Sequence, residues 1–327
     1  MLHAPTSAKK STTVRSKRAM RFARAALQAA YVLSEDLGTS VAERMFTTPR
    51  RFHRPARELP ILARGHRFTI DVTLGSPRWG GLRTPVTAWR WGVGPTVLLV
   101  HGWEGRGAQL GAFVEPLVAA GLSVVTFDAP AHGASPGSRA YLTDIADTIV
   151  DVAVAVGPLH GIVAHSFGCA AVLLAQSRGD VTAPHNVFIA PNILIPESVG
   201  RFTHALGLDS EERQLFEKQI VASSGMPLEG LLLPALVGKR DASLLVIHDT
   251  EDREVPHNQG EKLVASWPAP ARLESTSHLG HRRILRDPGV VALAVAEVRR
   301  GVPQPTSDLV REVDRQLAAI DAESAPI

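Results

Sequence analysis

A serine, two aspartates and two histidines stand in this chain just past short apolar runs, and together they could attack a carbonyl group. Ser166 lies in the segment AHSFG at 164–168, between an apolar run and a helical pattern. A serine on a sharp strand-to-helix turn needs small residues two positions before and after it, because the two backbones pack closely. Such a turn exposes the hydroxyl and brings the next backbone N–H, that of Phe167, to a helix N-terminus. Glycine is usual on both sides, and Ala164 adds one methyl group on the first.

The base that a serine nucleophile requires is found late in the chain, and acids that could orient it precede it. His278 and His281 lie in SHLGHRR at 277–283, close before the last helical pattern. Asp249 and Asp252 lie in HDTEDREVP at 248–256, after an apolar run. A catalytic histidine needs a carboxylate to fix its tautomer and to stabilise the imidazolium, and both aspartates qualify by type.

Two further loops follow buried, β-branched runs. The first, HGWEG at 101–105, is rich in glycine. Acyl transfer needs two preorganised donors for the developing oxyanion, and the backbone N–H groups of Trp103 and Phe167 could supply them. The second loop is DAPAHGAS at 128–135, in which we expect Asp128 and His132 to have a structural role.

Short apolar runs alternate with helical patterns over most of the chain. This alternation indicates a mainly parallel central sheet with helices on both faces. Ligands of such sheets bind outside the carboxyl ends of the strands, where the five segments above are expected. The predicted strands are 66–74, 85–91, 96–100, 123–127, 161–164, 186–190 and 244–248, and the predicted helices are 110–120, 141–156, 167–177, 211–221 and 288–300.

The N-terminal 34 residues are strongly basic. They carry seven Lys or Arg and no acid, so the net charge of +3 leaves 3 − 7 = −4 for the rest of the chain. Such an arm could contact nucleic acid, acidic lipid or another protein, and its composition is similar to that of an organelle transit peptide. We expect a solvated tail, disordered over about fifteen residues, and then a helix from Ser16 to about Phe46. The basic residues are Lys9, Lys10, Arg15, Lys17, Arg18, Arg21 and Arg24.

The 327 residues, 45% of them hydrophobic, can form one large domain or two. No unbroken apolar stretch follows the basic residues, as a secretory signal requires. The uncharged run from Val152 to Ser177 is long enough to span a membrane, but Gly, Pro and His interrupt it, so we reject a span there. The single cysteine, Cys169, excludes an intramolecular disulfide and fits a reducing cytoplasm. We expect it to be a buried packing residue.

From roughly Trp89 to Arg300 the sequence resembles the α/β-hydrolases. The acid of a D-x-x-V-P loop and the histidine of a late Gly-His pair complete the triad of that family. These positions correspond to Asp252 and His281, so that Ser166, acid and histidine follow the chain order of the family. Asp249, which we expect to shape the loop, and His278, at the entrance, are the fallback residues. The matching segments are HGW at 101–103, DAPAHGAS at 128–135, AHSFG at 164–168, HDTEDREVP at 248–256 and GHRRIL at 280–285.

The resemblance implies an α/β-hydrolase core over 61–190 and 244–302, with a helical cap insertion over 191–243. A basic arm and an extra helix (1–60) would precede the core, and a tail (303–327) would follow it. It also implies a serine esterase that cleaves a carboxylic ester or thioester through an acyl-enzyme on Ser166. We expect a small-molecule ester or acyl substrate, no cofactor or metal, no nucleic-acid partner, no transmembrane segment and a cytoplasmic location.

The same residues would serve an acyltransferase, a thioesterase, a peptidase or a carbon–carbon bond hydrolase, and the sequence leaves these open. Dehalogenases and soluble epoxide hydrolases of this fold place Asp at the elbow, so Ser166 argues against both. A non-catalytic ligand-binding relative usually lacks a member of the triad, whereas all three residues are present here.

Overall fold

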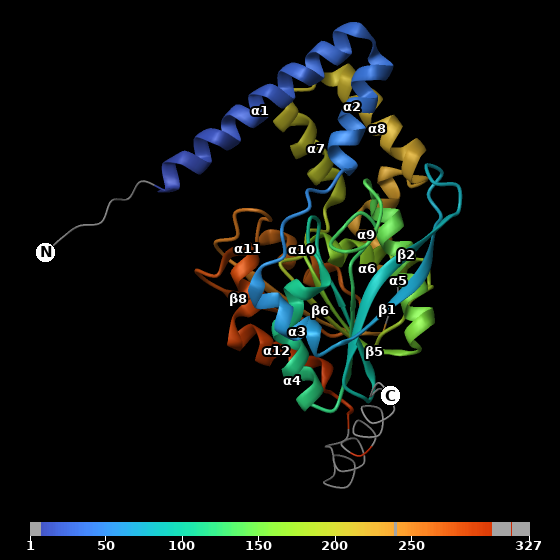
Figure 1. The fold of residues 1–327 in the computed structure, drawn as a ribbon, viewed down its shortest axis with the longest axis vertical. Coiled ribbons are helices and arrows are strands. Elements are labelled where there is room, and N and C mark those ends of the chain that lie inside the picture. Colours follow the sequence, from blue (N-terminus) through green and yellow to red (C-terminus); the bar gives the residue numbers. More distant parts are fainter. Residues whose placement is uncertain (1–7, 239–240, 303–314, 316–327) are drawn as a thin grey trace, which may run out of the picture.

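The computed structural model describes residues 8–238, 241–302 and 315, and its centre is one eight-stranded sheet (Figure 1). The strand order is β1-β2-β4-β3-β5-β6-β7-β8, in which β1–β2 and β2–β4 pair antiparallel and the remaining five pairs are parallel. The predicted α/β class with a mainly parallel sheet is therefore confirmed. The strands are β1 His66–Leu74, β2 Leu82–Trp91, β3 Thr96–Val100, β4 Ser123–Phe127, β5 Leu159–His165, β6 His185–Ile189, β7 Ser243–Asp249 and β8 Ala271–Thr276.

Helices cover both faces of the sheet because its central strands are apolar on both sides. Every residue of β3 and β4 is buried. In β3, Leu98 and Val100 belong to one core cluster, while Val97 and Leu99 belong to the other. Full burial of one such side chain stabilises the fold by about 1.5–3 kcal/mol. The first cluster packs under α5 Leu142–Val156, α6 Phe167–Ser177, α9 Leu233–Val237 and α10 Asn258–Ser266, and the second under α3 Leu59–Ala63, α4 Val114–Ala119 and α12 Pro288–Val298.

The strand order reverses at β3, which pairs with β4 on one side and with β5 on the other. A crevice forms where neighbouring parallel strands connect to helices on opposite faces of the sheet. The loops that leave β3 and β5 at this point contain HGW at 101–103 and Ser166.

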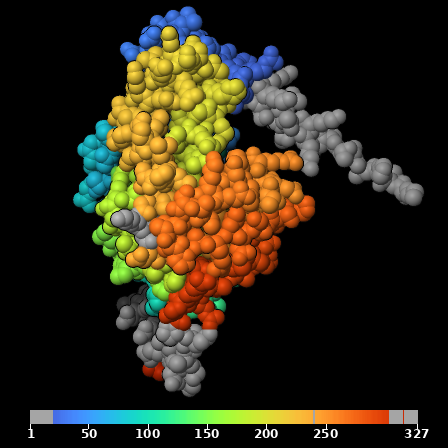
Figure 2. Space-filling view, turned by 180° about the vertical axis from the view of Figure 1, so that it is seen from behind, coloured from blue at the N-terminus to red at the C-terminus, as the bar shows by residue number. Residues whose placement is uncertain are grey.

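A third apolar cluster joins the N-terminal helices to the segment inserted between β6 and β7. It contains Leu27 and Ala42 from the first part and Val199, Phe216 and Ile220 from the second. These helices lie together above the sheet in Figure 1, and Figure 2 shows the inserted segment (yellow) directly against the N-terminal helices (blue). They are α1 Ala8–Leu33, α2 Glu35–Thr47, α7 Ile195–Leu206 and α8 Ser210–Ser224; the 3₁₀ helix η3 Leu228–Leu231 follows α8.

The N-terminal region differs from the sequence prediction. A helix starts at Ala8, inside the stretch expected to be disordered, and residues 1–7 lie outside the described residues. The predicted single helix is two helices, because the Ser34 side chain accepts a hydrogen bond from the Leu37 N–H and caps α2. The predicted tail, 303–327, lies outside the described residues except for Arg315.

Other differences are local. Neither α10 nor β8 was predicted from the sequence; β8 is an edge strand whose residues are half-buried or exposed. The predicted helix 110–120 begins as the 3₁₀ helix η2 Gly107–Phe113 before α4. Of the helices in the described ranges, none is both long enough and apolar enough to cross a bilayer.

A buried ionic cluster fastens α2 to the core. Glu43, which is 2% exposed, accepts a hydrogen bond from the Tyr141 hydroxyl (2.7 Å) and pairs with the Arg139 guanidinium (3.0 Å). Burial alone would raise the pKa of Glu43, but hydrogen bonds from Ser223, Tyr141 and Arg139 and the Arg139 charge lower it below its usual value. The carboxylate is therefore ionised and compensated.

Replacing this carboxylate should loosen the N-terminal helices. Glu43→Ala leaves the largely buried Arg139 side chain without its counter-charge, so we expect the free energy of unfolding to fall by about 3 kcal/mol. Urea unfolding followed by circular dichroism measures the change. Glu229→Ala, at an exposed position in η3, is the control and should change stability by less than about 0.5 kcal/mol. Equal stability of the two variants would contradict the structural role of the cluster.

Candidate active site

The backbone turns sharply at Ser166, between β5 and α6. Ser166 has φ 54° and ψ −123°, in the left-handed half of the map that non-glycine residues rarely occupy. A residue held there costs about 1–3 kcal/mol, which the surroundings must offset. Gly168 permits the turn: a Cβ built on it would lie 2.4 Å from the carbonyl oxygen of His101. Ala164 is fully buried beneath the turn, so the extra methyl group is accommodated.

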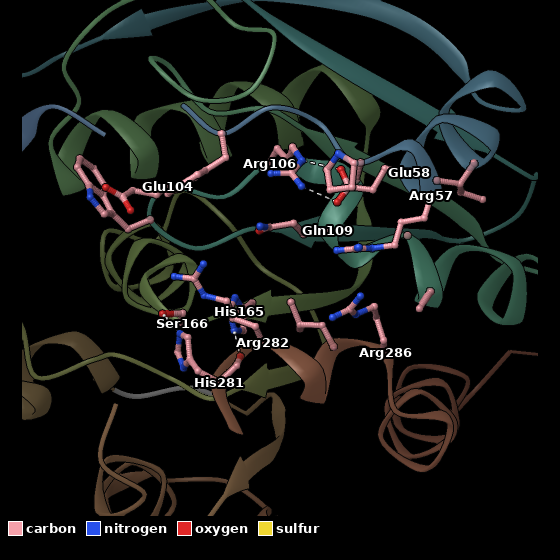
Figure 3. Close-up of a pocket in the computed structure, with 18 of the residues that line it drawn as sticks. Arg57, Glu58, Glu104, Arg106, Gln109, His165, Ser166, His281, Arg282 and Arg286 are labelled. Carbon is pink, nitrogen blue, oxygen red and sulfur yellow. Dashed lines mark hydrogen bonds and ion pairs between the residues drawn. The ribbon is translucent and has the colours of Figure 1, made fainter. Parts of the chain in front are cut away.

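The structure brings Ser166, His281 and Asp252 into one hydrogen-bonded chain. His281 Nε2 lies 3.0 Å from Ser166 Oγ, and His281 Nδ1 lies 2.7 Å from Asp252 Oδ2. Because the Nδ1–H donates to the carboxylate, Nε2 is the nitrogen that accepts the proton of the serine hydroxyl. Ser166 and His281, which Figure 3 shows side by side, are each 8% exposed, so the chain is largely shielded from water.

Asp252 is held as an anion. Its Oδ1 accepts hydrogen bonds from the N–H groups of Glu254 (2.8 Å) and Val255 (3.0 Å). Burial alone would raise the pKa of Asp252, but hydrogen bonds from His248 and His281, the His281 charge and the Val255 N–H lower it well below the usual value. His248 lies 3.5 Å from Asp252 Oδ2 and is completely buried.

The two fallback residues have other contacts. Asp249 Oδ2 accepts from the Thr276 hydroxyl (2.9 Å) and the Leu279 N–H (3.0 Å), and thereby joins the loops after β7 and β8. Although burial would raise the pKa of Asp249, these hydrogen bonds lower it. The His278 side chain is 82% exposed and pairs with Glu251.

The HGW loop rests on the serine turn. A Cβ built on Gly102 would lie 2.9 Å from Ser166 Cβ, and the Trp103 ring packs edge-on against the Phe167 ring at 5.6 Å. Phe167 begins α6, so its N–H is one of the first four that have no acceptor within the helix. The backbone segments of both expected donors therefore adjoin Ser166.

Buried, neutral histidines hold these loops. His101 donates from Nδ1 to the Gly102 carbonyl and accepts at Nε2 from the Ala129 N–H, while His165 donates to the His281 carbonyl at 3.0 Å. Burial lowers the pKa of His101 to about 4 and that of His165 to about 3. Burial likewise lowers the pKa of His132 to about 3, and its Nδ1 donates to the Pro130 carbonyl.

The DAPAHGAS loop is organised by Asp128. Its buried carboxylate accepts from the N–H groups of Gly107 (2.8 Å) and Ala134 (2.7 Å) and pairs with Arg54 (3.2 Å). Asp128 thus has the structural contacts expected of it. Cys169 is fully buried in α6, as predicted, and burial raises the pKa of its thiol.

Two cavities meet beside Ser166. One, of about 700 Å³, is lined by Ser166, His281 and several arginines (Figure 3). The other, of about 300 Å³, lies between α2, α7 and α8 and has mainly apolar walls, including Met45, Phe46 and Phe202. Trp103 and Asn192 line both cavities. Over the described ranges, no group of three or more His, Cys, Asp or Glu side chains is arranged to hold a metal ion.

The chain belongs to the alpha/beta hydrolase family, whose model matches residues 97–295. Among solved structures, Est1E from Butyrivibrio proteoclasticus with bound ferulic acid superposes with a TM-score of 0.55 at 18% identity, covering 71% of this chain and 96% of that chain. A bromoperoxidase from Bacillus anthracis superposes with a TM-score of 0.51 at 16% identity, covering 71% of this chain and 99% of that chain. A monoacylglycerol lipase from Paleococcus ferrophilus superposes with a TM-score of 0.50 at 19% identity, covering 65% of this chain and 99% of that chain. At these identities the likeness shows the fold alone. The comparison with curated sequences found no match.

Sequence reasoning missed three contributors to the site. His165 contacts the His281 carbonyl and His248 contacts Asp252, and no local sequence pattern predicts either contact. The segment 50–64, in which no helix or strand was predicted, supplies one wall of the larger cavity. Its closely spaced arginines were the available signal.

Adding one methyl group at Gly168 should distort the serine turn. The added Cβ of Gly168→Ala meets backbone oxygens, which cannot rotate away, so we expect a loss of about 1–3 kcal/mol in stability. Displacement of Ser166 should also slow labelling by a fluorophosphonate about 100-fold. Gly200→Ala is the matched control, since its Cβ meets only the Arg213 side chain at 3.8 Å. Unchanged labelling of Gly168→Ala would refute this account of the turn.

The buried histidines should make stability depend on pH. Because the pKa of His132 is about 3 when folded and about 6.5 when unfolded, its contribution is complete above pH 6.5 and is lost as pH falls toward 3. His132→Asn keeps a donor and removes the titration. We expect the loss of unfolding free energy between pH 7 and pH 5 to be smaller in this variant by about 1–2 kcal/mol. Urea unfolding at both pH values measures it, and parallel losses would contradict the prediction.

Proposed function

We propose that this protein is a serine hydrolase that cleaves a carboxylic ester, or a thioester, through an acyl-enzyme formed on Ser166. The observation that carries the proposal is the hydrogen-bonded chain from Ser166 Oγ through His281 to Asp252. The chain lies at the carboxyl edge of the sheet and opens into a cavity large enough for a small molecule.

The proposed reaction uses the two hydrogen bonds of His281. Ser166 Oγ attacks the carbonyl carbon while His281 Nε2 takes its proton, and the Asp252 carboxylate stabilises the imidazolium. The bond between the carbonyl carbon and the leaving oxygen or sulfur then breaks, and His281 returns the proton to the leaving group. Water, deprotonated by His281, next attacks the acyl-enzyme and releases the acid.

The backbone N–H groups of Trp103 and Phe167 are the proposed oxyanion donors. Both adjoin the nucleophile, and the Gly102 contact keeps the loop against the turn. Preorganised donors of this kind contribute about 2.7–4 kcal/mol each to transition-state stabilisation.

The apolar cavity is the proposed site of the acyl group. None of its lining residues is charged, and its walls come from α2 as well as from the inserted segment. We therefore assign 191–243 as a cap that the N-terminal helix α2 completes. An acyl chain in this cavity would start beside Trp103, where the two cavities meet.

The proposal is tested with a fluorophosphonate probe and a panel of short esters. The probe should add to Ser166, as located by mass spectrometry, and Ser166→Ala and His281→Ala should lower kcat/KM roughly 10⁴-fold or more. Asp252→Asn should lower it roughly 10³–10⁴-fold, because the tautomer of His281 is no longer fixed.

His278→Ala is the matched control for His281→Ala. Its ring is exposed and points to Glu251, so activity should stay within about twofold of the wild type. An adduct that persists in Ser166→Ala, or equal losses in the two histidine variants, would refute the assignment.

A further inference from the structure

The larger cavity has more cationic than anionic side chains. Four of its arginines are paired: Arg50 with Glu104 (2.8 Å), Arg64 with Glu115, Arg106 with Glu58 (2.5 Å) and Arg282 with Glu254 (3.0 Å). The lining contains six arginines and four glutamates, so 6 − 4 = 2 arginines remain. These are Arg57 and Arg286, which have no carboxylate partner within the described part of the chain.

The two unpaired arginines come from opposite walls. Arg57 belongs to the 3₁₀ helix η1 Ala56–Glu58 and Arg286 to the 3₁₀ helix η4 Ile284–Arg286. Figure 3 shows both side chains extending toward the same part of the cavity, beside Gln109. Arg286 follows His281 by five positions in consecutive helical turns, which corresponds to roughly 8 Å along the axis.

The residue next to each of the two arginines is buried, so the backbone at Arg57 and Arg286 is held in place. Glu58, next to Arg57, is 6% exposed and forms a two-point ion pair with Arg106 at 2.5 and 2.6 Å. Leu285, next to Arg286, is 4% exposed within the second core cluster. The guanidinium groups of Arg57 and Arg286 extend into the same part of the cavity and repel each other, and an anion bound between them would offset that repulsion. The planar guanidinium suits the oxygens of phosphate and carboxylate.

We propose that Arg57 and Arg286 bind an anionic group, a phosphate or a carboxylate, on the leaving-group part of the ester. The proposal rests on the serine hydrolase function above. The acyl part is assigned to the uncharged cavity, where an ionised group would lose its hydration without gaining a counter-charge. The anion therefore belongs on the alcohol or thiol part. When the carbonyl–oxygen bond breaks, that part leaves with the proton from His281 and with its anion still bound.

Three hexanoyl esters test this assignment, because they share the acyl group and differ in charge: hexanoylglycerol, hexanoylglycerol phosphate and hexanoylglycerate. We expect kcat/KM for at least one anionic ester to exceed that of the neutral ester by at least about fivefold, mainly through KM. Added salt should reduce the difference, because the arginines are exposed. The preferred anion identifies the group as phosphate or carboxylate.

The double variant Arg57→Gln/Arg286→Gln should abolish this preference and leave hydrolysis of hexanoylglycerol within about twofold. Arg67→Gln removes one positive charge from an exposed position on β1, outside the cavity, and should retain the preference. Equal rates on the three esters in the wild type, or equal losses on all three in the double variant, would overturn the inference.

A binding measurement tests the anion site independently of the hydrolase function. Calorimetry with Ser166→Ala should show hexanoylglycerol phosphate or hexanoylglycerate binding at least about fivefold more tightly than hexanoylglycerol, and the two arginine substitutions should remove the difference. Tighter binding of an anionic ester, together with no fluorophosphonate adduct on Ser166 in the wild type, would overturn the proposed catalysis alone. Esterase activity on Ser166 with equal affinity for all three esters would overturn the anion site alone.

Discussion

At Ser166 the loop after β3 packs against the turn between β5 and α6 with almost no side chain between the two backbones. The geometry of the site depends on this contact. Gly168 packs against the carbonyl of His101, and Gly102 packs against the Cβ of Ser166. Because neither position has room for a Cβ, the loop after β3 lies directly on the turn between β5 and α6. The same contact holds the serine in its rare conformation and sets the HGW loop beside its hydroxyl.

The polar groups around this contact are kept in defined protonation states by burial in the case of the histidines and by hydrogen bonds in the case of Asp252. His101 and His165 are neutral because they are desolvated, so each acts as a fixed donor and His101 also as an acceptor. Asp252 is charged because backbone N–H groups and histidines compensate it. The Asp252 carboxylate therefore carries a negative charge, and that charge faces His281.

The two cavities beside Ser166 offer opposite environments to the two halves of a substrate. Apolar side chains from α2 and the inserted helices form one, and arginines from 50–64 and 282–286 line the other. The N-terminal region therefore contributes to both cavities. The ion pair between Glu43 and Arg139 joins this region to the core. A segment outside the family match thus shapes the space around the candidate nucleophile.

The sequence by itself determined the order of strands β1 to β7, the sheet class and the small residues around Ser166, because periodicity and turn chemistry are encoded within a few neighbouring residues. It left Asp249 with Asp252, and His278 with His281, as pairs of equivalent type. Only the tertiary structure decided which of them lie beside Ser166, since the Ser166–His281 contact joins residues 115 positions apart. The edge strand β8 and the pairing of the cavity arginines depended on long-range packing in the same way, because burial and charge compensation are properties of the assembled fold.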